Sequence, residues 1–284
     1  MFYHPSPTQE KMLRSLARYK FLTISQMLRL GVAKHQPNVS KNLKTLRDRK
    51  LVATQGFSMV QRDDVSQKSK RVESIFYLTP KGAKEVMERL ELPEEKIKFP
   101  KQVKTLFSNV YFHRKYAIDC EISANISALE KGYEVTLFDR DFDKVGSNRK
   151  GKGASKTKIQ TKGDNYIIPD ANFILSNQDD EKLFTLELHN ERASRAIATQ
   201  LTNHTFAVEN GSVGLKYGIE RLHRVLNVFI EENKMNTVLE KLQKAKTAFR
   251  EMEMFFFFKT LENAKIGNFY DNWLNLDGNK VNLL

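Results

Sequence analysis

Cysteine is almost absent from this 284-residue sequence, and no long apolar run occurs in it. The one cysteine, Cys120, cannot form an internal disulfide, so we expect a cytoplasmic protein. The longest aromatic run, at 254–258, is far shorter than the roughly twenty apolar residues that cross a bilayer. The first residues, MFYHPSPTQE, lack the basic and then apolar order of a signal peptide. We therefore expect no association with a membrane.

Acidic residues are scarce in two parts of the chain, which makes the net charge of +13 uneven. Residues 1–100 carry 20 Lys and Arg against 10 Asp and Glu, and residues 146–165 carry 6 against 1. A positive field confined to one module and one loop is what binding to a phosphate backbone requires. Solubility alone does not need the charge to be segregated. The sequence therefore predicts a nucleic-acid-binding protein.

The length and the 40% hydrophobic content predict two domains, one over 1–95 and one over 101–284. In the first domain, Ser6 with Gln9 and Thr23 with Gln26 have the spacing of capping boxes, which predicts that two short helices begin there. A third helix is predicted over 37–50, and two strands with a polar loop between them are predicted over 51–78. This order of elements is typical of a winged helix-turn-helix.

The third predicted helix would enter the major groove of DNA, and the basic tip of the wing would contact the phosphate backbone. The outer face of this helix carries Ser40, Lys41, Lys44 and Arg47, and the wing tip carries Lys68, Lys70 and Arg71. A winged helix used only for protein contacts is the alternative, but the charge of +10 over residues 1–100 argues against it.

The second domain contains a basic, glycine-rich segment over 146–165, which has too few large apolar side chains to fold alone. It lies between a predicted strand at 133–138 and the strands discussed next, so we expect a cationic loop that clamps a nucleic-acid strand. Its candidate contacts are Arg149, Lys150, Lys152, Lys156 and Lys158. A disordered insertion is the alternative, and both descriptions hold if the loop orders only on binding.

Two β-prone runs, at 166–175 and 183–188, are joined by an acidic turn and predict a hairpin. Asp170 lies on the first run and Glu187 on the second. A hairpin would bring these two carboxylates side by side, where they repel each other unless a divalent cation or a shared proton balances them. Oxygen ligands of this kind favour Mg or Mn. The sequence therefore suggests a metal site made by Asp170 and Glu187.

Pro169-Asp170 followed by Glu187-Leu188-His189 resembles the PD-(D/E)xK signature of restriction-endonuclease-like nucleases, with His189 in place of the family lysine. The resemblance implies that the acidic pair binds the metal and that His189 positions the attacking water. It also implies that the helix predicted over 103–130 lends a third acid, Glu121 or Asp119. Arg192 is a candidate for the positive charge that the missing lysine would have supplied.

The order of predicted elements in the second domain (helix, three strands, helix, strand, helix, strand) is similar to the restriction-endonuclease-like core. The predicted fold class is α+β, with an N-terminal winged helix-turn-helix followed by a restriction-endonuclease-like α/β domain with a central mixed sheet. With both halves, the chain resembles the replication-relaxation family of plasmid and mobile-element proteins. Tyr77-Leu78-Thr79 with Gly82, His113-Arg114, Pro169-Asp170-Ala171, Glu187 and the end of the chain near Trp273 carry this resemblance.

The resemblance implies a relaxase-like, metal-dependent DNA nicking endonuclease that acts at an origin in replication or mobilisation. The alternative is a sequence-specific DNA-binding regulator or replication initiator with a catalytically silent nuclease-like domain. A covalent mechanism through Tyr166 is weaker, since no paired-histidine cluster accompanies it. The expected partner is duplex DNA, with single-stranded or nicked DNA and a homodimer left open.

Overall fold

The structure, a computed structural model, describes residues 4–60, 69–94, 97–100, 103–108, 110–145, 154–161, 165–190, 193–244 and 252–284. The protein is a mixed α and β structure with a central mixed sheet. Its chain forms two compact units, residues 1–114 and residues 115–284, which we describe separately. No described helix is long and apolar enough to cross a membrane.

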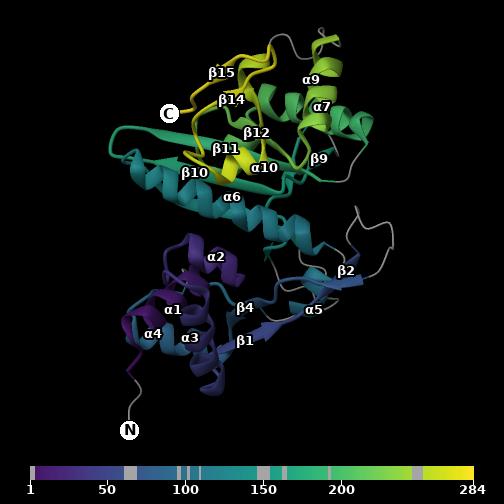
Figure 1. The fold of residues 1–284 in the computed structure, drawn as a ribbon. Coiled ribbons are helices and arrows are strands. Elements are labelled where there is room, and N and C mark those ends of the chain that lie inside the picture. The colour runs from purple at the N-terminus through teal and green to yellow at the C-terminus, as the bar shows by residue number, and fades with distance from the viewer. Residues whose placement is uncertain are drawn as a thin grey trace. The chain divides into compact units, whose positions relative to one another are not determined.

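Three helices open the first unit: α1 (Pro7–Tyr19), α2 (Ile24–Arg29) and α3 (Gln36–Asp48) (Figure 1). Both predicted capping boxes are confirmed. Gln9 N donates to Ser6 Oγ and Ser6 N donates to Gln9 Oε1, while Gln26 and Thr23 exchange the same pair of bonds. These bonds satisfy backbone N–H groups that have no partner inside the helix, and they fix where α1 and α2 begin.

Two short hairpins follow the helices. Strand β1 (Val52–Gln55) pairs antiparallel with β4 (Ile75–Leu78), and β2 (Ser58–Val60) pairs antiparallel with β3 (Ser69–Arg71). Leu22, between α1 and α2, bridges to Phe76 of β4 and ties the helices to the first hairpin. The sequence predicted one two-stranded wing here. The structure divides it into an inner pair, β1 with β4, and an outer hairpin, β2 with β3.

Helix α4 (Pro80–Arg89) begins at Thr79, whose Oγ1 accepts a hydrogen bond from Gly82 N at 3.0 Å. Thr79 N in turn donates to Leu51 O at 3.0 Å, so the start of α4 lies against the entrance to β1. A Cβ atom at position 82 would lie 2.0 Å from Leu51 O. Glycine is therefore required at this position by the close approach of the backbone.

The first unit extends beyond the linker predicted at 92–100. Lys98 N donates to Ala17 O, and the ring of Phe107 in α5 (Val103–Phe107) lies 4.9 Å from that of Phe21. The single helix predicted over 103–130 is corrected, because α5 ends at Phe107 and α6 (Tyr111–Glu130) begins four residues later. The rings of Phe107 and Tyr111, on either side of this break, lie 5.9 Å and 5.7 Å from the ring of Phe57.

The second unit is built on a seven-stranded sheet in the order β15-β14-β13-β12-β11-β10-β5. Strand β10 pairs antiparallel with both β5 and β11. Strands β12 and β13 then continue parallel to β11, and the short strands β14 and β15 end the sheet in antiparallel pairs. The strands are β5 (Glu134–Arg140), β10 (Ala171–Ser176), β11 (Glu181–His189), β12 (Arg224–Phe229), β13 (Phe256–Thr260), β14 (Trp273–Leu274) and β15 (Lys280–Val281).

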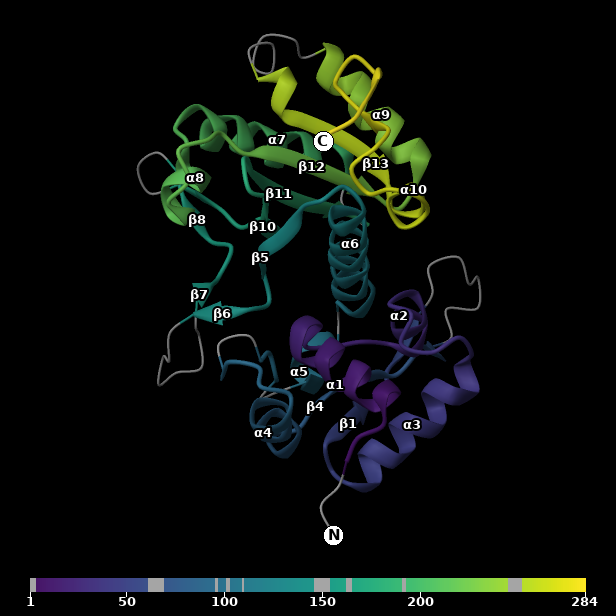
Figure 2. The same cartoon turned by 90° about the vertical axis from the view of Figure 1, so that its left-hand side faces the viewer.

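Helices cover both faces of this sheet. Figures 1 and 2 show α6 along one face and α7 (Ser194–Glu209) with α9 (Glu232–Lys244) on the other. Apolar side chains of α7, α9, β12 and β13 form one core cluster on the second face. Two short helices, α8 (Ser212–Tyr217) and α10 (Leu261–Lys265), complete the layer structure. Burial on both faces explains why β12 is almost continuously apolar.

Two predicted strands are shifted in the structure. The run at 166–168 does not extend β10. Instead β9 (Tyr166–Ile167) pairs antiparallel with β8 (Ile159–Gln160), because Pro169 has no N–H to donate to a ladder and ends the strand. The strand predicted at 254–258 begins at Phe256, after a single 3-10 turn. A further small pair, β6 (Lys144–Val145) with β7 (Ala154–Ser155), extends from β5.

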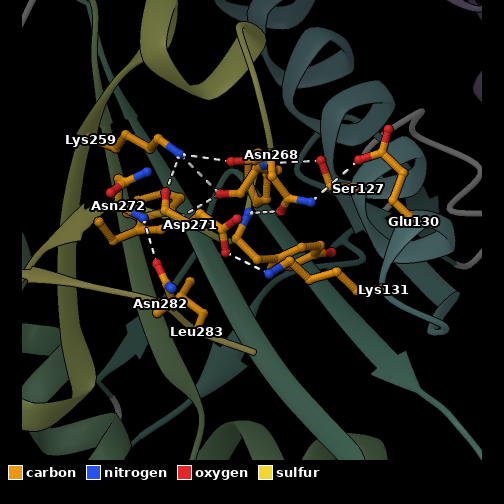
Figure 3. Close-up of polar contacts among 12 residues, drawn as sticks. Ser127, Glu130, Lys131, Lys259, Asn268, Asp271, Asn272, Asn282 and Leu283 are labelled. Carbon is orange, nitrogen blue, oxygen red and sulfur yellow. Dashed lines mark hydrogen bonds and ion pairs between the residues drawn. The ribbon is translucent and has the colours of Figure 1, made fainter.

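A buried lysine holds the C-terminal segment against the sheet (Figure 3). Lys259 of β13 is 5% exposed, and its Nζ donates to the backbone oxygens of Asn268, Phe269 and Asp271. Asp271 also pairs with Lys131 at 2.6 Å. Burial lowers the pKa of Lys259 to about 8, an effect that Asp271 opposes. Three carbonyl partners compensate for taking this ammonium group out of water.

Candidate functional site

The outer face of α3 is polar and basic, as predicted. Val39, Leu43 and Leu46 are buried, while the predicted contact residues on this helix, Ser40, Lys41, Lys44 and Arg47, are all exposed. Lys44 also forms an exposed ion pair with Asp48 at 3.0 Å. An exposed pair of this kind contributes little stability, so Lys44 remains available to an external phosphate.

The outer hairpin adds further cations to this unit. Lys70 and Arg71 lie on β3, where both side chains are exposed. Lys68, the third residue predicted at the wing tip, lies outside the described residues. A short exposed strand that carries two cations suits contact with a phosphate backbone.

The strand β11 carries its polar residues on the face covered by α7. Its register pairs Thr185 with Val225 and Glu187 with Asn227 of β12, and Val225 belongs to the core cluster under α7. Side chains alternate along a strand, so Glu187 and His189 face the same side as Thr185. The side chains of Glu187 and His189 therefore point into the layer between the sheet and α7.

Asp170 lies next to Glu187 in the hairpin. Ala171 pairs with Leu186, so Asp170 occupies the next position along the ladder, opposite Glu187. Its Oδ2 accepts a hydrogen bond from Leu188 N at 2.7 Å, which locks the carboxylate against β11. The predicted hairpin and the neighbouring positions of its two acids are thus present. Asp170 is partly exposed, whereas Glu187 is 2% exposed.

Helix α7 supplies two hydrogen-bond donors to Glu187. Gln200 Nε2 donates to Glu187 Oε2, and His204 Nε2 lies 2.6 Å from Glu187 Oε1. Gln200 and His204 are four residues apart on the helix, so both face the same strand. Because a carboxylate only accepts, His204 carries its proton on Nε2. The two donors fix both oxygens of Glu187.

His204 is neutral near pH 7. Burial lowers its pKa to about 4, and the charge of Asp170 opposes that shift. His223, whose ring lies 6.3 Å from that of His204, is also fully buried, and burial followed by the charge of His204 lowers its pKa well below the usual value. Among the described residues, His204 Nδ1 and both ring nitrogens of His223 have no hydrogen-bond partner. Buried polar atoms without a hydrogen bond are rare in native proteins, so this pair of imidazoles is an unusual feature of the α7 face.

His189 lies two positions beyond Glu187 and is also buried. Its Nε2 is 3.1 Å from Asn227 Oδ1, and its ring packs on Phe229. The amide nitrogen of Asn227 donates to Phe257 O at 3.2 Å, so the Asn227 oxygen accepts and His189 Nε2 is the donor. The structure thus holds His189 in one orientation on the same side as Glu187.

Glu121, the predicted third ligand, lies on the opposite face of the sheet. Its Oε2 accepts from Arg140 Nη1 at 3.1 Å, and Arg140 Nε donates to Asp143 at 3.1 Å. Arg140 pairs with Ala171 in the ladder, on the side that faces α6. The structure does not place Glu121 with Asp170 and Glu187. Asp119, the alternative acid on α6, forms an ion pair with Lys115 at 3.3 Å.

The two acids fit a magnesium or manganese ion in part. Among the described residues, no group of three or more His, Cys, Asp or Glu side chains has the arrangement of a metal site. Mg²⁺ is commonly held by one or two carboxylates while water and substrate phosphates fill its other positions, so a pair of acids is compatible with this cation. The donors on α7 would orient Glu187 from behind, as the neighbours of metal ligands often do.

Two residues of the predicted cationic loop lie in described segments. Lys156 pairs with Asp139 at 3.4 Å, and Lys158 Nζ lies 4.1 Å from the centre of the Tyr166 ring. Tyr166 itself is 50% exposed on β9. Arg149, Lys150 and Lys152 of the same loop, together with Arg192, lie outside the described residues.

Three residues of this site were not predicted from the sequence: Gln200, His204 and His223. The spacing of Gln200 and His204 on the helix that follows the Glu187 strand is a detectable signal, because it places a donor pair on one helix face. Nothing in the sequence distinguishes His223 from an ordinary residue at the start of a strand.

Comparison with known proteins gives little further information. No family model matches the chain, and no curated protein matches it. The solved structure of restriction endonuclease FokI bound to DNA has a TM-score of 0.26 at 9% identity, covering 93% of this chain and 68% of that one. So low a TM-score decides nothing about function. The resemblance to the replication-relaxation family stays a prediction.

Proposed function

We propose that this protein binds duplex DNA through its first unit, which we interpret as a winged helix. The observation that carries the proposal is the exposed face of α3, where Lys41, Lys44 and Arg47 lie opposite a fully buried apolar face. A helix held by its apolar face presents its outer side chains rigidly, as entry into the major groove requires. Lys70 and Arg71 of β3 would contact the phosphate backbone.

A salt titration of duplex binding tests this proposal. The variant Lys41→Gln, Lys44→Gln, Arg47→Gln removes three cations, so the slope of log affinity against log salt should become shallower by about 3. The matched control replaces Lys234, Lys241 and Lys244 of α9, which changes the net charge equally in the other unit. Equal salt dependence in the parent and the α3 variant contradicts the assignment.

The second candidate function is metal-dependent cleavage of one DNA strand by the second unit. The observation that favours it is the adjacency of Asp170 and Glu187 in the hairpin, with Glu187 held by two donors from α7. Two neighbouring carboxylates held on rigid strands are suited to a divalent cation. The donors orient Glu187 without adding a positive charge, because His204 is neutral.

In this proposal each residue of the candidate site has a defined task. Asp170 and Glu187 would hold Mg²⁺ or Mn²⁺, which when bound would supply Lewis-acid activation of a phosphodiester and of water. Leu188 N–H fixes Asp170, while Gln200 and His204 fix Glu187. His189 donates its Nε2 proton in a hydrogen bond to Asn227 Oδ1. Its other ring nitrogen, Nδ1, is therefore the atom that would accept a proton from water.

Nicking of supercoiled plasmid DNA tests cleavage, and melting of the protein with and without Mg²⁺ or Mn²⁺ tests metal binding separately. We expect metal-dependent conversion to the open circle and a higher melting temperature with metal. If the second unit binds DNA without cleaving it, the plasmid should stay supercoiled and the metal should not raise the melting temperature. An origin-specific, relaxase-like role in a plasmid or mobile element rests on the sequence resemblance alone, and cleavage restricted to one plasmid origin would support it.

A further inference from the structure

A small β-ribbon beside the carboxylates turns an aromatic ring outward. In the β8–β9 pair, Ile159 lies opposite Ile167 and Gln160 lies opposite Tyr166. The two isoleucines are 2% and 6% exposed and belong to an apolar cluster that also includes Ala207 of α7. Since side chains alternate along a strand, anchoring this pair turns the Tyr166 side outward.

Exposed and buried positions alternate along the segment that joins Tyr166 to the candidate site. Ile168 is 43% exposed, while Ile167 and Pro169 on either side of it are buried, and Asp170 is partly exposed. Tyr166, Ile168 and Asp170 therefore alternate with the buried positions along one short segment. Four residues of extended chain span at most about 14 Å, so the ring lies within a few nucleotides of the Asp170 carboxylate.

A cationic group lies at the same ring, and a second lysine holds the segment that carries it. Lys158 Nζ is 4.1 Å from the ring centre of Tyr166, which is a cation–π distance. Lys216 of α8 donates to the backbone oxygens of Lys156 and Lys158, and so fixes the segment that carries Lys158. The exposed aromatic side chain and the neighbouring ammonium group are thus both attached to the core of the unit.

We propose that Tyr166 is a stacking platform for an unpaired base, with Lys158 contacting the adjoining phosphate and Ile168 lying against the next nucleotide toward Asp170. Aromatic rings combined with cations are the usual means of binding single strands without sequence preference. The faces of paired bases are covered by stacking inside a duplex, so this surface selects single-stranded DNA or a duplex with a single-stranded tail. The inference rests on the proposed cleavage site and names its substrate class.

The test measures binding of the full-length protein to single-stranded DNA in the presence of a chelator, so that it does not depend on cleavage. We expect Tyr166→Ala to weaken this binding about fivefold to 150-fold, because one stacked base contributes about 1–3 kcal/mol. Tyr166→Phe keeps the ring and should bind like the parent. A 2-aminopurine base in the oligonucleotide should be quenched by the parent and by Tyr166→Phe, and not by Tyr166→Ala.

The matched control is Tyr133→Ala. Tyr133 is a partly exposed tyrosine with Lys182 Nζ 5.9 Å from its ring centre, at the turn end of the β10–β11 hairpin, away from Asp170. The Tyr133→Ala variant should bind single-stranded DNA as tightly as the parent. Duplex binding through α3 should be unchanged in every variant. Parent-like single-strand affinity in Tyr166→Ala overturns the inference even if the protein nicks DNA. Loss of affinity in Tyr166→Ala alone supports it even if cleavage is never observed.

Discussion

The two faces of the seven-stranded sheet hold their charged groups in different ways. On the α6 face, Glu121 and Asp143 both bond to Arg140, which is fully buried. Burial opposes the charged form of Arg140, but the two carboxylates outweigh it and raise its pKa. On the α7 face, Glu187 accepts hydrogen bonds from Gln200 and from a neutral His204.

We interpret this difference as one between acids that stabilise the fold and acids that suit a ligand. The charge of Glu121 is balanced by a neighbouring guanidinium inside the unit, so binding a cation there would first require breaking a buried ion pair. The two described donors to Glu187, Gln200 and the neutral His204, carry no charge. Of the three acids predicted as ligands, Asp170 and Glu187 are neighbours in one hairpin, whereas Glu121 lies on the other face of the sheet.

The largest expected effect is on cleavage. Glu187→Gln keeps the size of the side chain and removes its charge, so plasmid nicking should fall about a thousandfold, the upper end of what the loss of one electrostatic contribution costs. The melting temperature in metal-free buffer should change little. Glu121→Gln is the matched control on the other face, and it should leave the response of the melting temperature to Mn²⁺ intact. A variant Glu187→Gln that still nicks would remove the α7 face from consideration.

The next largest effect is on stability and belongs to the α6 face. Arg140→Met leaves the carboxylates of Glu121 and Asp143 without their buried partner, which should destabilise the second unit by about 3–5 kcal/mol. Denaturant unfolding measures this loss. Adding Glu121→Gln to the same chain should recover part of it, because one unpaired charge disappears. Additive losses in the double variant would show that the two residues do not interact.

The sequence predicts what local patterns determine. The capping boxes at Ser6 and Thr23 involve only residues three apart, and both are present. The hairpin that brings Asp170 beside Glu187 follows from two apolar runs and one turn. These features depend on chain neighbours, and tertiary packing leaves them unchanged.

The remaining features depend on packing between distant segments. Whether Glu121 faces Asp170 or Arg140 is set by which side of the sheet α6 covers, and apolar periodicity does not contain that information. His204 reaches Glu187 only because α7 crosses β11 at one rotation about its axis. The break between α5 and α6 is likewise not marked in the sequence, since residues 108–110 contain neither proline nor glycine.

The buried imidazole of the α7 face should make the second unit sensitive to acid. His204 has a folded pKa of about 4 against 6.5 for the free side chain, so the unfolded chain binds more protons between these values. The contribution of His204 to the free energy of unfolding is therefore fully present above about pH 6.5. It falls by about 3 kcal/mol as the pH decreases toward 4. His204→Gln keeps a donor for Glu187 and should show a smaller loss between pH 7 and 5. Identical pH dependence in the two proteins would contradict the assignment.

The smallest expected effect distinguishes a working residue from a packed one on the α7 face. His189→Gln places an amide beside Asn227, where it can still donate to Oδ1, so the free energy of unfolding should fall by only about 1 kcal/mol. The amide cannot replace the second ring nitrogen as a proton acceptor. Cleavage should therefore fall about a hundredfold, the lower end of the contribution of a general base. Loss of activity should be greatest at neutral pH and reduced at high pH, where hydroxide replaces the assisted water. Parent-like nicking by His189→Gln would instead show that His189 serves packing against Phe229, as Glu121 serves the ion pair with Arg140.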